Sequence, residues 1–314
     1  MIRGAENNMA TNISRRELIS GLGIAAGIGT TSSAAGNSTV ASDPPKRVGG
    51  PHIRVGCCAY SYRDYLTGKK TPAMSLDDFV NRAAEMGIDG VELTSYYFPS
   101  DVTASYIHKL VRRCFLLGLD INGTAIGNKF TVPPGEERNK EIALVKRWID
   151  FAVDMGAPSA RIFAGATPAG VSDEQARKWV VECIDTCCEY AANKGVMLAL
   201  ENHGGIVATA DGILNILKAV NSEWFGMKWD SGNFHSEDPY MELIRTAPYA
   251  MTTHIKTDIV RVNKREDSDL ARIVRILRDA NYRGYLHLEY EGAADAMAAV
   301  PKALKALAAL TAAS

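Results

Sequence analysis

The 314-residue sequence lacks an excess of charge of either sign. It has 35 Lys and Arg against 36 Asp and Glu, which gives a formal net charge of −1. Proteins that coat nucleic acid or bind acidic membranes usually carry a strong positive excess. It also lacks a long hydrophobic run, because the apolar stretch at 18–28 is too short and too rich in glycine to span a membrane. We therefore predict no nucleic-acid partner and no membrane-embedded segment.

Several sequence motifs are also missing. None of the six cysteines forms a Cys-x-x-Cys pair, which argues against a zinc ribbon and a thioredoxin-type redox site. No G-x-G-x-x-G follows the first expected strand, so a dinucleotide fold is disfavoured. No glycine-rich phosphate cradle is present either, which agrees with an unphosphorylated substrate. The cysteines are best interpreted as small buried hydrophobic residues.

The first forty residues differ in composition from the rest. Arg15-Arg16 precedes the apolar stretch 18–28, and small residues follow as far as Ala41. This order is typical of a secretory signal, and the paired arginines indicate the twin-arginine route. The alternative is a disordered tail with a chance arginine pair. We predict a signal peptide at 1–41, a linker at 42–52, a barrel domain at 53–314 and a periplasmic or otherwise extracytoplasmic location.

After the linker, short apolar runs alternate with longer amphipathic stretches. This pattern predicts a parallel sheet covered by helices, and eight such units suit a closed barrel. The fold class is therefore α/β, a single (β/α)8 TIM barrel. The expected strands are 53–59, 90–94, 119–126, 160–164, 196–201, 225–230, 251–256 and 285–290. The expected helices are 76–86, 105–117, 136–155, 174–193, 210–220, 239–245, 269–279 and 293–310.

Polar residues gather at the ends of the last four expected strands. They are Glu201, Asp230, His254 and Glu289. In such barrels the active site lies at the carboxyl ends of the strands, and charged residues inside apolar strands are costly unless they are paired or bind a metal. Taken singly, each residue could instead be a helix cap, a surface residue or a structural group. Together they predict a site for one divalent cation, Mn2+, Mg2+, Co2+ or Zn2+.

Four segments carry a family resemblance that covers roughly residues 53–312. They are ALENHGG (199–205), WDSGN (229–233), HIK (254–256) and LEY (288–290). The sequence resembles the xylose isomerase-like TIM barrel superfamily, in particular the sugar phosphate isomerase/epimerase group of ketose 3-epimerases and hydroxypyruvate isomerase. The resemblance implies that Glu201, Asp230, His254 and Glu289 coordinate one divalent cation. It also implies that Glu201 and Glu289 form the acid/base pair.

Four further residues are candidates for substrate binding. Asn233 stands where sugar epimerases often carry a histidine. Glu92 ends the second strand and either faces the pocket or caps a helix. His203 either contacts substrate oxygens or holds the loop that follows it.

Lys256 is the fourth of these candidates. It lies two residues beyond His254 and points the same way from the strand. It either neutralises an oxyanion or pairs with Asp258.

These features indicate an isomerase or epimerase that removes a proton beside a carbonyl of an unphosphorylated sugar, through an enediolate. A 3-keto-glycoside lyase or hydratase would use the same metal and glutamate base, and a non-catalytic sugar-binding barrel is a further alternative. An endonuclease is disfavoured, because the chain is nearly neutral and has only six histidines. The expected partner is a small-molecule sugar, and the resemblance is compatible with a homo-oligomer.

Overall fold

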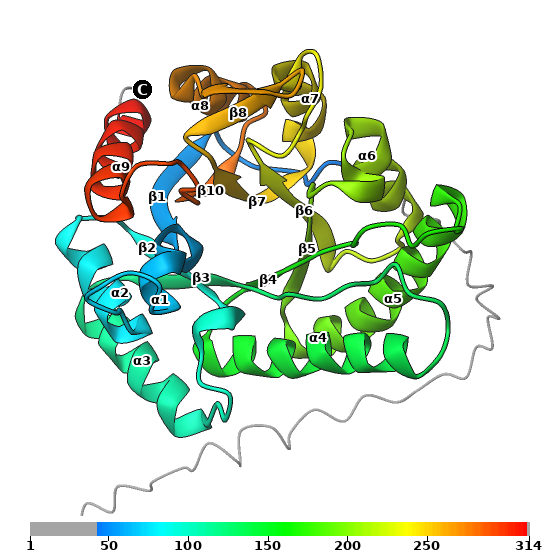
Figure 1. Cartoon of the computed structure of the whole chain (residues 1–314), viewed down its shortest axis with the longest axis horizontal. Coiled ribbons are helices and arrows are strands. Elements are labelled where there is room, and N and C mark those ends of the chain that lie inside the picture. Colours follow the sequence, from blue (N-terminus) through cyan, green and yellow to red (C-terminus); the bar gives the residue numbers. More distant parts are fainter. Residues whose placement is uncertain (1–42, 313–314) are drawn as a thin grey trace, which may run out of the picture. The chain divides into compact units, whose positions relative to one another are not determined.

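The computed structural model describes residues 43–312 and shows a closed barrel of parallel strands (Figure 1). The strands follow one another around the barrel in the order β1-β10-β7-β6-β5-β4-β3-β2, and pairing of β1 with β2 closes it. The predicted (β/α)8 barrel is therefore confirmed. The barrel strands are β1 His52–Cys58, β2 Gly90–Thr94, β3 Asp120–Ala125, β4 Ser159–Ile162, β5 Met197–Glu201, β6 Phe225–Asp230, β7 Ala250–Ile255 and β10 Arg283–Leu288.

Helices surround the barrel on the outside (Figure 1). They are α1 Arg63–Leu66, α2 Leu76–Glu85, α3 Ala104–Leu116, α4 Glu136–Met155, α5 Asp173–Lys194, α6 Ala210–Ala219, α7 Pro239–Thr246, α8 Leu270–Asp279 and α9 Ala296–Ala312. Local sequence explains their ends. Ser75 and Asp78 form a capping box at the start of α2. Gly156 and Gly195 end α4 and α5 in the left-handed conformation that glycine adopts without strain.

A short hairpin follows β7 and was not predicted. It pairs β8 Asp258–Arg261 with β9 Lys264–Asp267 in antiparallel register. The two residues between these strands, Val262 and Asn263, have φ angles of 46° and 60°. Two left-handed residues are what a tight hairpin turn requires, but valine is a poor signal for that conformation. The turn is therefore hard to recognise in the sequence.

The barrel interior is unusually polar near the carboxyl ends of its strands. Side chains of a strand alternate between the two faces, so residues two apart point the same way. Lys228 and Asp230 of β6 both point inward, whereas Trp229 between them points outward and donates a hydrogen bond to the Leu243 carbonyl of α7. The pairs His254 and Lys256, and His287 and Glu289, repeat this spacing on the next two strands of the barrel. Alternation thus brings several polar and charged side chains into the barrel.

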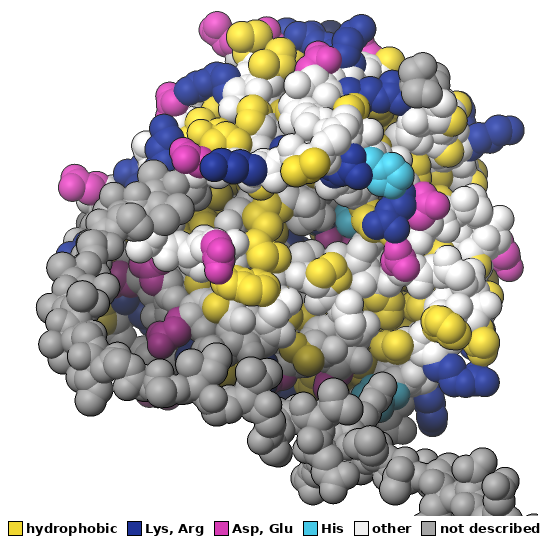
Figure 2. Space-filling model, turned by 180° about the vertical axis from the view of Figure 1, so that it is seen from behind, with side chains coloured by type: hydrophobic (Ala, Val, Ile, Leu, Met, Phe, Trp, Pro, Cys, Tyr) yellow, Lys and Arg dark blue, Asp and Glu magenta, His cyan; other side chains and the backbone are white. Residues whose placement is uncertain are grey.

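The outer surface shows no comparable concentration of charge on the face drawn in Figure 2. Basic, acidic and apolar side chains are interspersed there. Across residues 43–312, the longest and most apolar helices still fall short of what a membrane crossing requires. All six cysteines are free and buried, as predicted. The predicted signal peptide at 1–41 lies outside the described residues.

Candidate metal centre and active site

Four buried side chains meet inside the barrel at the carboxyl ends of its strands. Glu201 and Asp230 are the last residues of β5 and β6, His254 is the fifth residue of β7, and Glu289 follows β10 directly. One ligand atom from each lies within 4.8 Å of every other. The structure thus brings together the four residues that the sequence predicts as metal ligands.

Three atoms of this cluster that accept or donate no hydrogen bond among residues 43–312 suit a cation. Glu201 Oε2, Asp230 Oδ2 and His254 Nδ1 are buried and have no hydrogen-bond partner among residues 43–312. His254 Nδ1 lies 3.4 Å from Glu201 Oε2, 3.4 Å from Glu289 Oε2 and 3.9 Å from Asp230 Oδ2. Buried polar atoms are rarely left without a partner. Carboxylate oxygens with one imidazole nitrogen are donors that Mn2+, Co2+ and Zn2+ accept.

The other atom of each of these three groups is held by the protein. Glu201 Oε1 accepts a hydrogen bond of 3.0 Å from Asn233 Nδ2. Asp230 Oδ1 accepts one of 2.8 Å from the Gly232 amide. His254 Nε2 lies 2.6 Å from Glu92 Oε1. Each group is thereby turned so that its second ligand atom faces the cluster.

The charges of the cluster also favour a cation. Burial raises the pKa of Asp230 to about 7, and the Glu201 and Glu289 carboxylates contribute to this rise against the opposing charge of Lys256. Burial would likewise raise the pKa of Glu289, but His254 and Lys256 outweigh it and lower that pKa. Three carboxylates this close repel one another unless positive charge lies between them. A bound divalent ion would supply that charge.

Lys256 lies at the rim of the cluster. Its ammonium contacts the Glu289 carboxylate, lies 2.7 Å from Glu291 Oε2 and is 3.5 Å from Asp230 Oδ2. The alternative prediction that Lys256 pairs with Asp258 is wrong, because Asp258 pairs with Arg265.

Two other residues predicted to bind substrate, Glu92 and His203, lie in different parts of the barrel. Glu92 is buried inside the barrel, and its carboxylate contacts Lys228 and His254. The helix-cap alternative for Glu92 is therefore wrong. His203 is exposed on the loop after β5, and its ring centroid lies 4.6 Å from that of Phe163. Substrate contact by Glu92, His203, Lys256 and Asn233 stays a prediction.

Lys228 and Arg161 also lie at the site, although neither is among the residues predicted from the sequence. Lys228 is fully buried, and Arg161 Nε lies 3.2 Å from Glu201 Oε2. The signal for Lys228 is its position two residues before Asp230, which places it on the same face of β6.

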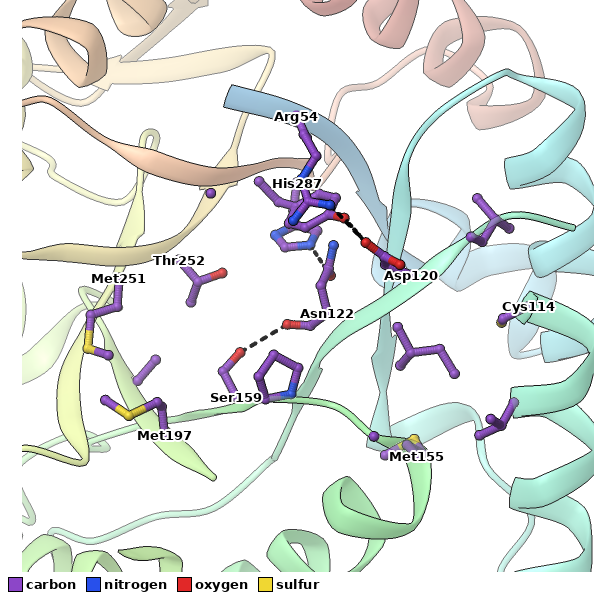
Figure 3. A pocket seen from close by; sticks show the side chains of 18 of the residues that line it. Arg54, Cys114, Asp120, Asn122, Met155, Ser159, Met197, Met251, Thr252 and His287 are labelled. Carbon is purple, nitrogen blue, oxygen red and sulfur yellow. Dashed lines mark hydrogen bonds and ion pairs between the residues drawn. The ribbon is translucent and has the colours of Figure 1, made fainter. Parts of the chain in front are cut away.

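A cavity of about 530 Å3 opens at the other end of the barrel. Asp120, Ser159 and Met197 line it, and these residues begin β3, β4 and β5. Figure 3 shows Asn122 and His287 turned toward each other inside it. In TIM barrels this end serves stability, whereas catalysis takes place at the opposite end. The cavity is therefore distinct from the metal cluster.

A family model described as xylose isomerase-like TIM barrel matches residues 80–310. The chain belongs to this family. The family predicted from the sequence is thereby confirmed. A comparison with curated proteins finds no match.

Several solved structures share the fold. A D-psicose 3-epimerase in the presence of D-fructose has 17% identity and a TM-score of 0.67, over 82% of this chain and 98% of that chain. An IOLI protein with a bound zinc atom has 15% identity and a TM-score of 0.68, over 82% and 96%. The 3-keto-D-glucoside 4-epimerase YcjR from E. coli has 17% identity and a TM-score of 0.63, over 82% and 99%.

Proposed function

We propose that the chain is a metal-dependent sugar isomerase or epimerase that removes a proton beside a carbonyl. The observation that carries this proposal is the cluster of Glu201, Asp230, His254 and Glu289, in which three buried ligand atoms converge without hydrogen-bond partners in the described part of the chain. The neighbours named as sugar epimerases, and the one with a bound zinc atom, support the same interpretation.

The four residues of the cluster would hold one divalent cation, for which Mn2+, Mg2+, Co2+ and Zn2+ are the candidates. Such a cation stabilises negative charge that develops on a carbonyl oxygen during proton removal. Asp230 and His254 would serve as ligands only, whereas Glu201 and Glu289 also carry protons.

The two glutamates are placed to work as a pair. Glu201 and Glu289 come from β5 and from the end of β10, with β6 and β7 between these strands in the barrel. One carboxylate removes the proton from the carbon beside the carbonyl, and the other returns a proton to the neighbouring position or to the opposite face. Asn233 orients Glu201, and Lys256 orients Glu289, so each carboxylate has its own support.

The substrate that we propose is an unphosphorylated sugar or keto-sugar. Two cations near the cluster, Lys256 and Arg161, are already engaged by carboxylates, so neither offers a free charge to a phosphate group. The relatives named for D-psicose and for a 3-keto-D-glucoside support the same substrate class.

We further propose export to the periplasm by the twin-arginine route. The Arg15-Arg16 pair and the apolar stretch at 18–28 support this location. Six free, buried thiols are compatible with it, because the fold does not depend on disulfides formed after export. A homo-oligomer stays a prediction.

Proton NMR in D2O tests the proposed chemistry. We expect the metal-loaded chain to exchange deuterium into the carbon beside the carbonyl of a free ketose or a 3-keto-glucoside, with a new sugar appearing. Glu289→Gln and Glu201→Gln should lower this exchange by about 100-fold or more, because each removes a proton carrier. Glu182→Gln on the outer helix α5 is the matched control and should exchange like the wild type.

Two other outcomes would contradict this proposal. Release of the aglycone with an unsaturated or hydrated keto-sugar would make the protein a lyase. Failure of the metal-loaded wild type to exchange deuterium into any of these sugars would favour a sugar-binding protein.

A further inference from the structure

A chain of buried charged groups lies behind the metal cluster. His254 Nε2 is 2.6 Å from Glu92 Oε1, and the other oxygen of Glu92 contacts the Lys228 ammonium. The exposed fraction is 0% for Lys228, 1% for Glu92 and 0% for His254. Water therefore does not compete for these contacts.

The chain of contacts crosses the barrel. Lys228 and His254 belong to the adjacent strands β6 and β7, whereas Glu92 belongs to β2. In the strand order around the barrel, β2 lies opposite β6. Glu92 therefore reaches through the interior to meet both partners, and their positions depend on the closed barrel.

This arrangement decides which nitrogen of His254 is available. A carboxylate can only accept a hydrogen bond, so the ring nitrogen facing Glu92 carries the proton. The other nitrogen, Nδ1, faces the atoms of Glu201, Asp230 and Glu289, so its lone pair would be the one available to a bound cation. A carboxylate behind a metal-binding histidine fixes both its tautomer and its ring orientation.

Lys228 compensates the buried charge of Glu92. A single carboxylate buried without a counter-charge is costly and tends to take up a proton or shift position. The Lys228 ammonium compensates the charge of Glu92 and holds the oxygen that His254 does not use. A gain in the stability of the fold does not by itself explain the Glu92–Lys228 pair, since buried ion pairs often add little stability compared with hydrophobic residues of similar size.

We propose that Glu92, held by Lys228, is a positioning residue that orients His254 as a metal ligand. The proposal rests on the proposed function, because it presumes that the four-residue cluster binds a divalent cation. In this role Glu92 acts on the metal site through His254.

Calorimetric titration of the metal-stripped full chain with Mn2+ tests this role. We expect Glu92→Gln to weaken Mn2+ binding by about 10- to 100-fold, the usual loss for a partner behind a metal-binding histidine. Glu182→Gln is the matched control, because Glu182 pairs with Arg138 at 2.7 Å on the outside of the barrel. Its Mn2+ affinity should equal that of the wild type.

A double variant keeps the test decisive if Glu92→Gln fails to fold because Lys228 is left unpaired. Glu92→Gln with Lys228→Met removes both charges, so it should unfold at a temperature close to that of the wild type and still bind Mn2+ weakly. Wild-type affinity in the folded double variant would overturn the positioning role. If the wild type itself binds no metal ion, the proposed metal-dependent function is contradicted, and the positioning role of Glu92 is contradicted with it.

Discussion

The Arg161 guanidinium lies inside the barrel between a carboxylate and an aromatic ring. Its Nε is 3.2 Å from Glu201 Oε2, its Nη1 donates a hydrogen bond to the Ile126 carbonyl, and its central carbon lies 3.7 Å from the centre of the Phe163 ring. Both partners of the ion pair are at most 3% exposed. Breaking a buried pair leaves one charge uncompensated, whereas breaking a surface pair changes little.

Arg161→Met should therefore destabilise the metal-free protein by about 3 kcal/mol. Arg54→Met is the matched control, because Arg54 pairs with Asp120 at the surface, where the two side chains are 44% and 60% exposed. That variant should lose less than about 1 kcal/mol. Urea unfolding with a chelator present measures both variants, and equal losses would show that Glu201 does not depend on Arg161.

At the scale of secondary structure, the hydrophobic periodicity and the helix-capping residues of the sequence predict most of the barrel. The strands at 90–94 and 225–230 and the helix at 136–155 match the structure at both ends. These segments are short runs made mostly of apolar residues or long amphipathic stretches, for which the local pattern is sufficient. The β8–β9 hairpin was missed because its turn contains Val262 rather than glycine.

The candidate site was predictable in part for a similar reason. Parallel strands of a barrel bring their carboxyl ends together, so the ends of the last four predicted strands indicate the four ligands without any coordinates. The contact between Glu92 and Lys228 could not be predicted in this way. It joins opposite strands, so it depends on the diameter of the barrel and on side-chain conformations.

The start of α9 offers a prediction about pH. The carboxylate of Asp295 accepts hydrogen bonds from Lys70 Nζ at 2.8 Å, from the Tyr65 hydroxyl and from the Met297 amide. The Lys70 and Tyr65 contacts are the main causes that lower the pKa of Asp295 from 3.8 to about 2. Because the pKa is lower in the folded state, the stabilisation is present above about pH 4 and is lost as the pH falls toward 2.

Asp295→Asn should therefore lower the melting temperature at pH 7, and the difference from the wild type should shrink at pH 3. Thermal unfolding at both pH values measures it. Asp101→Asn, at an exposed position before α3, is the control and should differ little from the wild type at either pH. A difference that stays constant with pH would mean that the carboxylate charge of Asp295 is not what stabilises the start of α9.

At the scale of the whole molecule, the metal cluster joins strands that are far apart in the sequence. Its ligands come from β5, β6, β7 and the residue after β10, so a bound ion would connect half of the barrel. An ion that binds only the folded state stabilises it by mass action, by about 2.7 kcal/mol at 100 times the dissociation constant.

Removing the ion with a chelator should therefore lower the melting temperature by roughly 5–10 °C for a domain of this size. Differential scanning calorimetry with Mn2+ and then with chelator measures the shift. Asp230→Asn removes one ligand, so its shift should be much smaller. An unchanged shift in that variant would place the stabilising ion somewhere other than the four-residue cluster.

The burial of the six cysteines has a chemical consequence. Every one of these thiols is at most 1% exposed in the closed barrel. Oxidation to a sulfenic acid or a mixed disulfide needs access to the sulfur, so it requires the fold to open first. The chain therefore protects its thiols by packing alone, and the time for which they stay reduced is set by how often the barrel opens.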